Sequence, residues 1–251
     1  MPRLKELIHT AGSRLTSVIC TIPSATVTQA LAASGIDAVI VDLEHGAVDY
    51  ATAHAMIAAT AGTGCAPMVR VAENDERLVK RVLDLGAEGI IFPLVGTAEE
   101  AERAVASMRY PPNGTRGFGP FIAQSRWNTT LMEYADKMDD ALACCLTVET
   151  RKGVENIEEI CKVPGIDLII PAPFDLSTDM GLMGQFDHPE FKAAVARVEN
   201  AAHAAGIPLG NAALNAQQAA AMYGRGYRFL AAFDILWLRA KAAEMVGWAS
   251  V

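Results

Sequence analysis

The stretch from Ala38 to Arg70, AVIVDLEHGAVDYATAHAMIAATAGTGCAPMVR, decides the fold, because it contains a strand, a helix and the following strand in one unit. Apolar strand-like runs cover residues 38–42 and 68–71, and a helical pattern covers residues 49–61 between them. Short apolar strands that alternate with helices are typical of a parallel sheet whose faces are covered by helices.

The same alternation continues along the whole chain of 251 residues. Further strands are expected at Ser17–Thr21, Gly89–Pro93, Ala143–Glu149, Leu168–Ala172, Leu209–Asn211 and Phe229–Ala232. Further helices are expected at Ala25–Ser34, Asp75–Leu85, Ala98–Met108, Gly153–Cys161, Pro189–Ala205 and Ala216–Arg225. Eight such units in a chain of this length predict an α/β fold of the (β/α)8 type, a TIM barrel, as one domain over residues 1–251. The alternative is a doubly wound sheet, but no GxGxxG follows the first strand.

Composition limits the classes of partner. A content of 51% hydrophobic and 20% charged residues excludes intrinsic disorder, and the net charge of -8 argues against nucleic acid or an anionic membrane as the main partner. The five cysteines show no CxxC spacing, which favours reduced thiols in a cytoplasm. The N-terminus has no signal-peptide pattern and no apolar run is long enough to span a bilayer, so we expect a cytoplasmic protein.

Two segments interrupt the regular alternation. Residues 109–130 form a long connection, and long ordered connections are usually lids or binding loops. The C-terminal segment Ile235–Trp248 carries Leu236, Trp237, Met245 and Trp248, which is more apolar surface than one exposed terminal helix should present. We therefore expect this helix to pack against another chain.

Candidate chemistry is concentrated at the carboxyl ends of the expected strands, where barrel enzymes place their active sites. Glu149 and Asp175 are the candidate metal ligands, because carboxylates without thiolates favour Mg²⁺ or Mn²⁺; the alternative is that both only cap loops. His45 is suited to proton transfer near neutral pH, or is a solvated loop residue. Arg70 ends an apolar strand, so it needs an anionic partner and is placed to stabilise an enolate.

Lysine positions favour metal-assisted chemistry over a Schiff base. No lysine lies within an expected strand, and Lys152, just beyond the fifth strand, is the one weak candidate. The glycines at 114, 117 and 119, with Arg116 and Arg126 nearby, either cradle a carboxylate or phosphate or simply permit tight turns.

Six ordered segments carry a resemblance over essentially the whole chain. They are VDLEHGAVD (41–49), PMVRVAEND (67–75), RYPPNGTRGFG (109–119), SRWN (125–128), VETRKGVENI (148–157) and FDLSTDMG (174–181). Together they resemble the HpcH/HpaI family of class II, metal-dependent pyruvate aldolases, in particular the HpaI-like hydroxy-oxo-acid aldolases. The resemblance implies a carbon–carbon lyase that reversibly cleaves 4-hydroxy-2-oxo acids to pyruvate, or a hydroxypyruvate-like donor, and an aldehyde.

The resemblance also assigns roles to residues of this sequence. It implies that Glu149 and Asp175 bind Mg²⁺, Mn²⁺ or Co²⁺, that His45 is the catalytic base and that Arg70 stabilises the transition state. Asp84 corresponds to an acid that raises the basicity of the histidine. Asp84 ends a helix on the far side of its own barrel, so this role implies contact across subunits, in a homo-hexamer with exchanged C-terminal helices.

The sequence departs from the family pattern near the substrate, where Thr147, Phe174 and Asp175 are the expected binding residues. Thr147 stands where the family often has Gln, and Ala172-Pro173-Phe174-Asp175 replaces Gly-Pro-Ala-Asp. A common aromatic residue is also replaced around Ile19-Cys20. Backbone groups at Phe174 and Asp175 are still expected to meet the substrate carboxylate.

Two alternative functions stay open. A citrate-lyase-like acyl-CoA lyase would need a basic nucleotide site beside the mouth, and no Lys/Arg cluster marks one. A non-catalytic binding barrel would not need polar residues at four strand ends. The aldolase reading is favoured over both.

Overall fold

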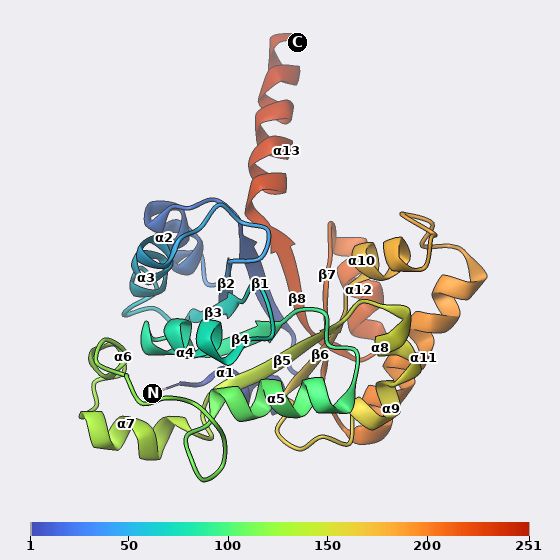
Figure 1. The fold of residues 1–251 in the computed structure, drawn as a ribbon. Helices are drawn as coiled ribbons and strands as arrows, with labels where there is room; N and C mark the ends of the chain where they lie inside the picture. Colours follow the sequence, from blue (N-terminus) through green and yellow to red (C-terminus); the bar gives the residue numbers. More distant parts are fainter. Residues whose placement is uncertain (1, 251) are drawn as a thin grey trace.

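The computed structural model describes residues 2–250 and shows a closed barrel of eight parallel strands in chain order (Figure 1). The strands are β1 (Leu15–Cys20), β2 (Ala38–Asp42), β3 (Ala66–Arg70), β4 (Gly89–Phe92), β5 (Ala143–Val148), β6 (Leu168–Pro171), β7 (Leu209–Ala212) and β8 (Tyr227–Phe233). Each strand pairs with the next one, and β8 pairs with β1 to close the ring. The (β/α)8 prediction is confirmed, and the doubly wound alternative is wrong.

Helices surround the barrel and connect its strands (Figure 1). They are α1 (Leu4–His9), α2 (Ala25–Ala33), α3 (Tyr50–Ala58), α4 (Glu76–Asp84), α5 (Ala98–Met108), α6 (Ala123–Arg126), α7 (Leu131–Met138), α8 (Arg151–Glu155), α9 (Ile157–Ile160), α10 (Pro173–Asp179), α11 (Pro189–Ala205), α12 (Ala216–Gly224) and α13 (Asp234–Gly247), followed by the 3-10 turn η1 (Trp248–Ser250). The bounds of α5 and α11 are those expected from the sequence. The single helix expected at 153–161 is instead two short helices, α8 and α9.

Strand residues alternate between two apolar layers, as the pleat requires. Ile40, Met68 and Phe229 belong to a buried cluster inside the barrel. A larger cluster between the strands and the helices contains the neighbours of these residues. The adjacent Cys144 and Cys145 fall in the outer and inner clusters respectively, so they face opposite sides of β5, and all five cysteines are free and buried.

Helix α1 closes the amino-terminal end of the barrel. Its apolar Leu4 and Ile8 are fully buried and belong to the cluster inside the barrel. The backbone N–H of Leu4 donates to the buried carboxylate of Glu88 at 2.6 Å, and the N–H of Arg3 donates to the same oxygen. The open end of the barrel is therefore the carboxyl end of the strands.

Helix α13 projects away from the barrel (Figure 1). Asp234 at its start is buried and accepts hydrogen bonds from the backbone N–H groups of Thr21 and Ile22, which fixes the junction to the end of β1. Beyond this residue the large apolar side chains are exposed, including Trp237 at 45% and Trp248 at 64%. No helix in the described part of the chain is long and apolar enough to cross a membrane.

Candidate active site

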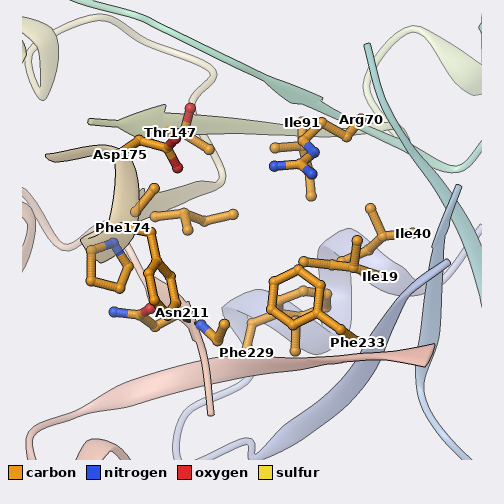
Figure 2. A pocket seen from close by; sticks show the side chains of 15 residues that line it. Ile19, Ile40, Arg70, Ile91, Thr147, Phe174, Asp175, Asn211, Phe229 and Phe233 are labelled. Atoms are coloured by element: carbon orange, nitrogen blue, oxygen red, sulfur yellow. Dashed lines mark hydrogen bonds between the residues drawn. The ribbon is translucent and has the colours of Figure 1, made fainter. Parts of the chain in front are cut away.

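A cavity of about 80 Å³ opens at the carboxyl end of the strands, inside the mouth of the barrel (Figure 2). Four of the residues predicted from the sequence line it: Arg70, Thr147, Phe174 and Asp175. Figure 2 shows the guanidinium of Arg70 on one side of the cavity and the side chains of Thr147 and Asp175 together on the opposite side. Below them the walls are apolar, with Ile19, Phe229 and Phe233.

Arg70, the last residue of β3, is held in place by a carboxylate from the neighbouring strand. Its Nε lies 2.9 Å from Asp42 Oδ1 and its Nη2 lies 2.7 Å from Asp42 Oδ2, which is a bidentate ion pair. Nη1 is 3.2 Å from Glu44 Oε2. Burial lowers the pKa of the Arg70 guanidinium, but its ion pairs with Asp42 and Glu44 outweigh this effect and raise the pKa overall. The anionic partner that the sequence required is therefore present.

Asp42 anchors the candidate site, although the sequence analysis did not single it out. Its side chain is completely buried at the end of β2. Besides the two bonds from Arg70, Oδ1 accepts the backbone N–H groups of Glu44 at 3.1 Å and His45 at 3.3 Å. One carboxylate thus fixes both the arginine and the loop that carries the histidine. The signal in the sequence was a carboxylate that directly ends an otherwise apolar strand.

His45 stands on the loop between β2 and α3, at the edge of the mouth. Its side chain is 61% exposed, and its Nε2 lies 3.8 Å from Glu44 Oε2. Gly46 allows the loop to turn back here, because a Cβ at this position would lie 2.3 Å from the Asp42 carbonyl oxygen. Burial raises the pKa of the Glu44 carboxyl, and Arg70 partly offsets that increase.

Glu149, directly after β5, is a buried carboxylate with one oxygen still available. Its Oε1 accepts the backbone N–H of Leu94 at 2.5 Å and lies 2.8 Å from Thr147 Oγ1. Within residues 2–250, Oε2 has no hydrogen-bond partner. Burial raises the pKa of Glu149, the two hydrogen bonds lower it, and the nearby Asp175 carboxylate raises it again. Arg70 also lowers the pKa of Glu149 electrostatically, but among the described residues neither Glu149 nor Asp175 forms a direct ion pair.

The backbone around Leu94 is strained where it meets Glu149. Leu94 has a φ of 56°, in the left-handed region that a leucine rarely adopts, and its side chain is 60% exposed. Strained residues of this kind cluster at functional sites, where the surrounding structure holds them. This backbone conformation points the Leu94 N–H toward Glu149. A leucine at this position gives no indication in the sequence of such a conformation.

The carboxylates of Glu149 and Asp175 fit a hard divalent cation. Asp175 lies in the first turn of α10, exposed to the mouth, and acts electrostatically on Glu149. The described residues include no group of three or more His, Cys, Asp or Glu side chains suited to hold a metal ion. Two carboxylates are nevertheless the kind of donor set with which Mg²⁺ keeps several coordination positions for water and substrate.

Asp84 lies away from the mouth of its own barrel. It is the last residue of α4, a helix that returns toward the amino-terminal end of the strands. Its Oδ1 accepts a hydrogen bond at 2.8 Å from Nη2 of Arg116, which is buried beneath the rings of Tyr110 and Tyr134. The structure thus joins His45, Arg70, Glu149 and Asp175 at one end of the barrel and does not bring Asp84 to them within one chain.

The glycine-rich connection forms turns and does not cover the mouth. A Cβ on Gly114 would lie 2.3 Å from the Ala106 carbonyl oxygen, so this glycine is required by a close backbone approach. Arg116 is committed to Asp84, and Arg126 donates to Thr60 Oγ1 at 2.6 Å. The tight-turn interpretation of the glycines is favoured over the anion cradle, and none of the described residues in 109–130 lines the mouth cavity.

Comparisons with known proteins agree with this arrangement. The family model described as HpcH/HpaI aldolase/citrate lyase matches residues 20–237. The chain is similar to the 2-dehydro-3,6-dideoxy-6-sulfogluconate aldolase of Pseudomonas putida, with 36% identity over 89% of this chain and 88% of that protein. It is 39% identical to the hydroxypyruvate/pyruvate aldolase of Chromohalobacter salexigens, over 86% of this chain and 85% of the relative. Among solved structures, an HpcH/HpaI aldolase/citrate lyase family protein from Burkholderia cenocepacia has a TM-score of 0.92 at 28% identity, over 100% of both chains.

Proposed function

Because the chain belongs to the HpcH/HpaI aldolase/citrate lyase family, we propose that it is a carbon–carbon lyase that reversibly cleaves 4-hydroxy-2-oxo acids to an oxo acid and an aldehyde. The oxo acid is pyruvate or a hydroxypyruvate-like donor, in keeping with the name of the similar hydroxypyruvate/pyruvate aldolase. The observation that carries the proposal is the mouth itself, where a fixed guanidinium, Arg70, stands across from the carboxylates of Glu149 and Asp175.

Glu149 and Asp175 would hold a divalent cation, Mg²⁺, Mn²⁺ or Co²⁺. When bound, such a cation supplies Lewis-acid polarisation of a keto oxygen. Thr147 and the Leu94 N–H hold Oε1 of Glu149, which leaves Oε2 for the cation. The described chain offers oxygen ligands here and no thiolate, since all five cysteines are buried in the apolar layers or against the barrel wall.

His45 and Arg70 carry the proton and the charge of the reaction. In cleavage, His45 accepts the proton of the C4 hydroxyl, the C3–C4 bond breaks, and its electron pair passes to the oxo acid as an enolate. Arg70 stabilises the enolate oxygen, and Asp42 holds the guanidinium so that it need not reorient during the reaction. The free backbone N–H groups of Phe174 and Asp175 orient the substrate carboxylate. Thr147, whose hydroxyl donates to Glu149, lines the cavity beside the substrate.

The remaining part of the proposal concerns assembly. We expect a homo-hexamer in which α13 packs on a neighbouring barrel, because its apolar side chains are exposed in the single chain. In that assembly Asp84 would reach His45 of a neighbouring copy and raise its basicity. The Asp84 side chain is 22% exposed beside Arg116, so part of its carboxylate remains accessible to a neighbouring copy.

The acyl-CoA alternative has less support. A CoA nucleotide would need a basic cluster beside the mouth. Among the described residues that line the mouth cavity only Arg70 is basic, and the basic residues of the adjoining space, Lys192 and Arg225, are paired with Asp187 and Glu199. The fold and these wall residues favour small oxo-acid substrates.

A direct assay tests the proposed function. The protein is incubated with pyruvate or hydroxypyruvate, a panel of aldehydes, and Mg²⁺, Mn²⁺ or Co²⁺, and carbon–carbon bond formation is followed by loss of the oxo acid and by product mass. We expect a 4-hydroxy-2-oxo acid in the presence of metal. Absence of any condensation product with all three metals, or product trapping by borohydride on Lys152, would overturn the proposal.

A further inference from the structure

A second, larger cavity of about 600 Å³ adjoins the mouth, in a cleft between α11 and α12. We call it the α11–α12 cleft. Its inner wall is made of apolar side chains, among them Phe186, Phe191, Val195 and Met222. A cavity of this size is in the range of small-molecule sites, which are lined mainly by apolar and aromatic side chains. The reaction described above makes no use of it.

The cleft and the mouth cavity share part of their walls. Pro173, Phe174, Asn211 and Ala212 line both. Figure 2 shows the Phe174 ring and Asn211 side by side at the wall of the mouth. The two spaces therefore lie on either side of one thin partition, and Phe174 is its largest side chain.

Phe174 is a half-exposed side chain on a backbone that is held by hydrogen bonds. Its carbonyl oxygen accepts hydrogen bonds from Ser177 Oγ at 2.9 Å and Thr178 Oγ1 at 2.8 Å, which hold the turn at the start of α10. The ring is 49% exposed and touches Phe186 only edge-on, with centroids 5.2 Å apart. Rotation of this ring would join the cleft to the mouth without moving Asp175.

The charged groups around the cleft are already paired, so the space favours an uncharged occupant. Lys192 lies 2.7 Å from Asp187. Arg225 lies 3.4 Å from Glu199, which also accepts a hydrogen bond from Tyr227 at 2.7 Å. The shared partition carries no charged side chain. A terminal carboxylate, phosphate or sulfonate would have to compete with Asp187 and Glu199 for these two cations, which lie at the exposed rim of the cleft.

We propose that the α11–α12 cleft binds the apolar tail of the aldehyde half of the substrate, so that the enzyme acts on 4-hydroxy-2-oxo acids with aliphatic or aromatic tails. The inference rests on the proposed function, since it names the class of its acceptor. The short end of the aldehyde stays at the mouth beside His45, and the tail passes Ala212 and Phe174 into the cleft.

A chain-length series measures the subsite. The kcat/KM for condensation with pyruvate is determined for straight-chain aldehydes from acetaldehyde to octanal. Each methylene transferred from water to an apolar site contributes up to about fourfold in kcat/KM. We expect a steady increase with chain length and a preference for heptanal over succinic semialdehyde. If short aldehydes react but kcat/KM does not increase with chain length, the subsite proposal is overturned and the proposed function is retained. An enzyme inactive with every aldehyde overturns the proposed function, and the subsite with it.

Matched variants locate the effect in the cleft. Ala196 on α11 and Ala221 on α12 are exposed residues that line the cleft and not the mouth. A196F or A221F should fill the cleft, lower kcat/KM for heptanal at least tenfold and leave the value for acetaldehyde within twofold. A193F is the control, because exposed Ala193 lines a separate groove between α8 and α11.

Two further outcomes would contradict the proposal. If A196F and A193F show the same chain-length profile as the unmodified protein, the tail binds elsewhere. If A196F leaves that profile unchanged but lowers the mass of the assembly by light scattering, the cleft is a contact between subunits. Circular dichroism of each variant confirms that helix content is retained, so that a loss for heptanal alone reports the subsite.

Discussion

The ion pair between Asp42 and Arg70 gives the sharpest prediction, because one buried carboxylate holds two parts of the site. In Asp42→Asn the side chain keeps its shape and one acceptor oxygen. That oxygen can still accept the N–H groups of the following loop, as Asp42 Oδ1 does. In the unmodified protein Arg70 Nη2 donates to Asp42 Oδ2 at 2.7 Å. In the variant the amide NH₂ takes the place of that oxygen and faces the same nitrogen. The variant therefore loses a charge and places two donors against each other.

The cost follows from the burial of the pair. The side chains of Asp42 and Arg70 are 0% and 13% exposed, so solvent screens them little. Removing one partner of a buried pair costs about 3–5 kcal/mol in the free energy of unfolding. Most folded domains have about 5–15 kcal/mol in total, so the variant should still fold at low temperature. Because the guanidinium is no longer fixed, kcat should fall by about 10²–10³.

Urea unfolding and initial rates of oxo-acid release check both numbers. Asp49→Asn is the control: Asp49 caps α3 through Thr52, Asn caps helices equally well, and stability should change by less than about 0.5 kcal/mol. In an Arg70→Met background, Asp42→Asn should cost at least about 1.5 kcal/mol less. A D42N protein with stability within about 1 kcal/mol of the parent and kcat within threefold would refute the reasoning.

Four other outcomes are expected. EDTA should abolish activity and Mg²⁺, Mn²⁺ or Co²⁺ restore it, since carboxylates are the proposed ligands; full activity of the metal-free protein would contradict this. Arg70→Ala should lower kcat about 10²–10³-fold with little change in metal affinity by titration, because Arg70 faces the enolate. Removal of the residues after Asp234 should reduce both the mass by light scattering and the activity of the same sample; an unchanged mass would contradict the exchanged helix. Burial raises the pKa of Glu44 in the folded chain, so its contribution to stability decreases as pH rises above its unfolded pKa of about 4.3; the effect of Glu44→Gln on the free energy of unfolding in urea should therefore be more favourable at pH 7 than at pH 4.

The barrel was predictable because its strands are buried on both faces. Such strands appear in the sequence as short apolar runs, and β2 was placed with its observed bounds. His45, Arg70 and Glu149 each follow or end one of those runs. Because the carboxyl ends of all strands in a (β/α)8 barrel meet at one end of the barrel, the sequence predicted that these residues lie at the same mouth. The exposed C-terminal helix was also predictable, because its apolar residues follow the eighth strand and no further strand is available for them to pack against.

What the sequence could not supply depends on contacts across the fold. Asp42 could not be distinguished from a carboxylate that caps a loop until the register of β2 and β3 placed Arg70 opposite it. The left-handed backbone at Leu94 is imposed by its surroundings, because leucine has no preference for it. The pairing of Asp84 with Arg116 joins positions 32 residues apart, and only the folded chain brings them together.

The closure of the barrel floor by α1 has a consequence for kinetics. Over residues 2–250 the floor is sealed by Leu4 and Ile8, so both products of the proposed cleavage share one exit. We expect the oxo acid, bound between Arg70 and the carboxylates, to lie deeper than the aldehyde and to leave second. Release would then be ordered, and in product-inhibition assays pyruvate should inhibit cleavage competitively with respect to the substrate, whereas the aldehyde should inhibit noncompetitively. In the reverse direction the same geometry requires the oxo acid to bind before the aldehyde arrives.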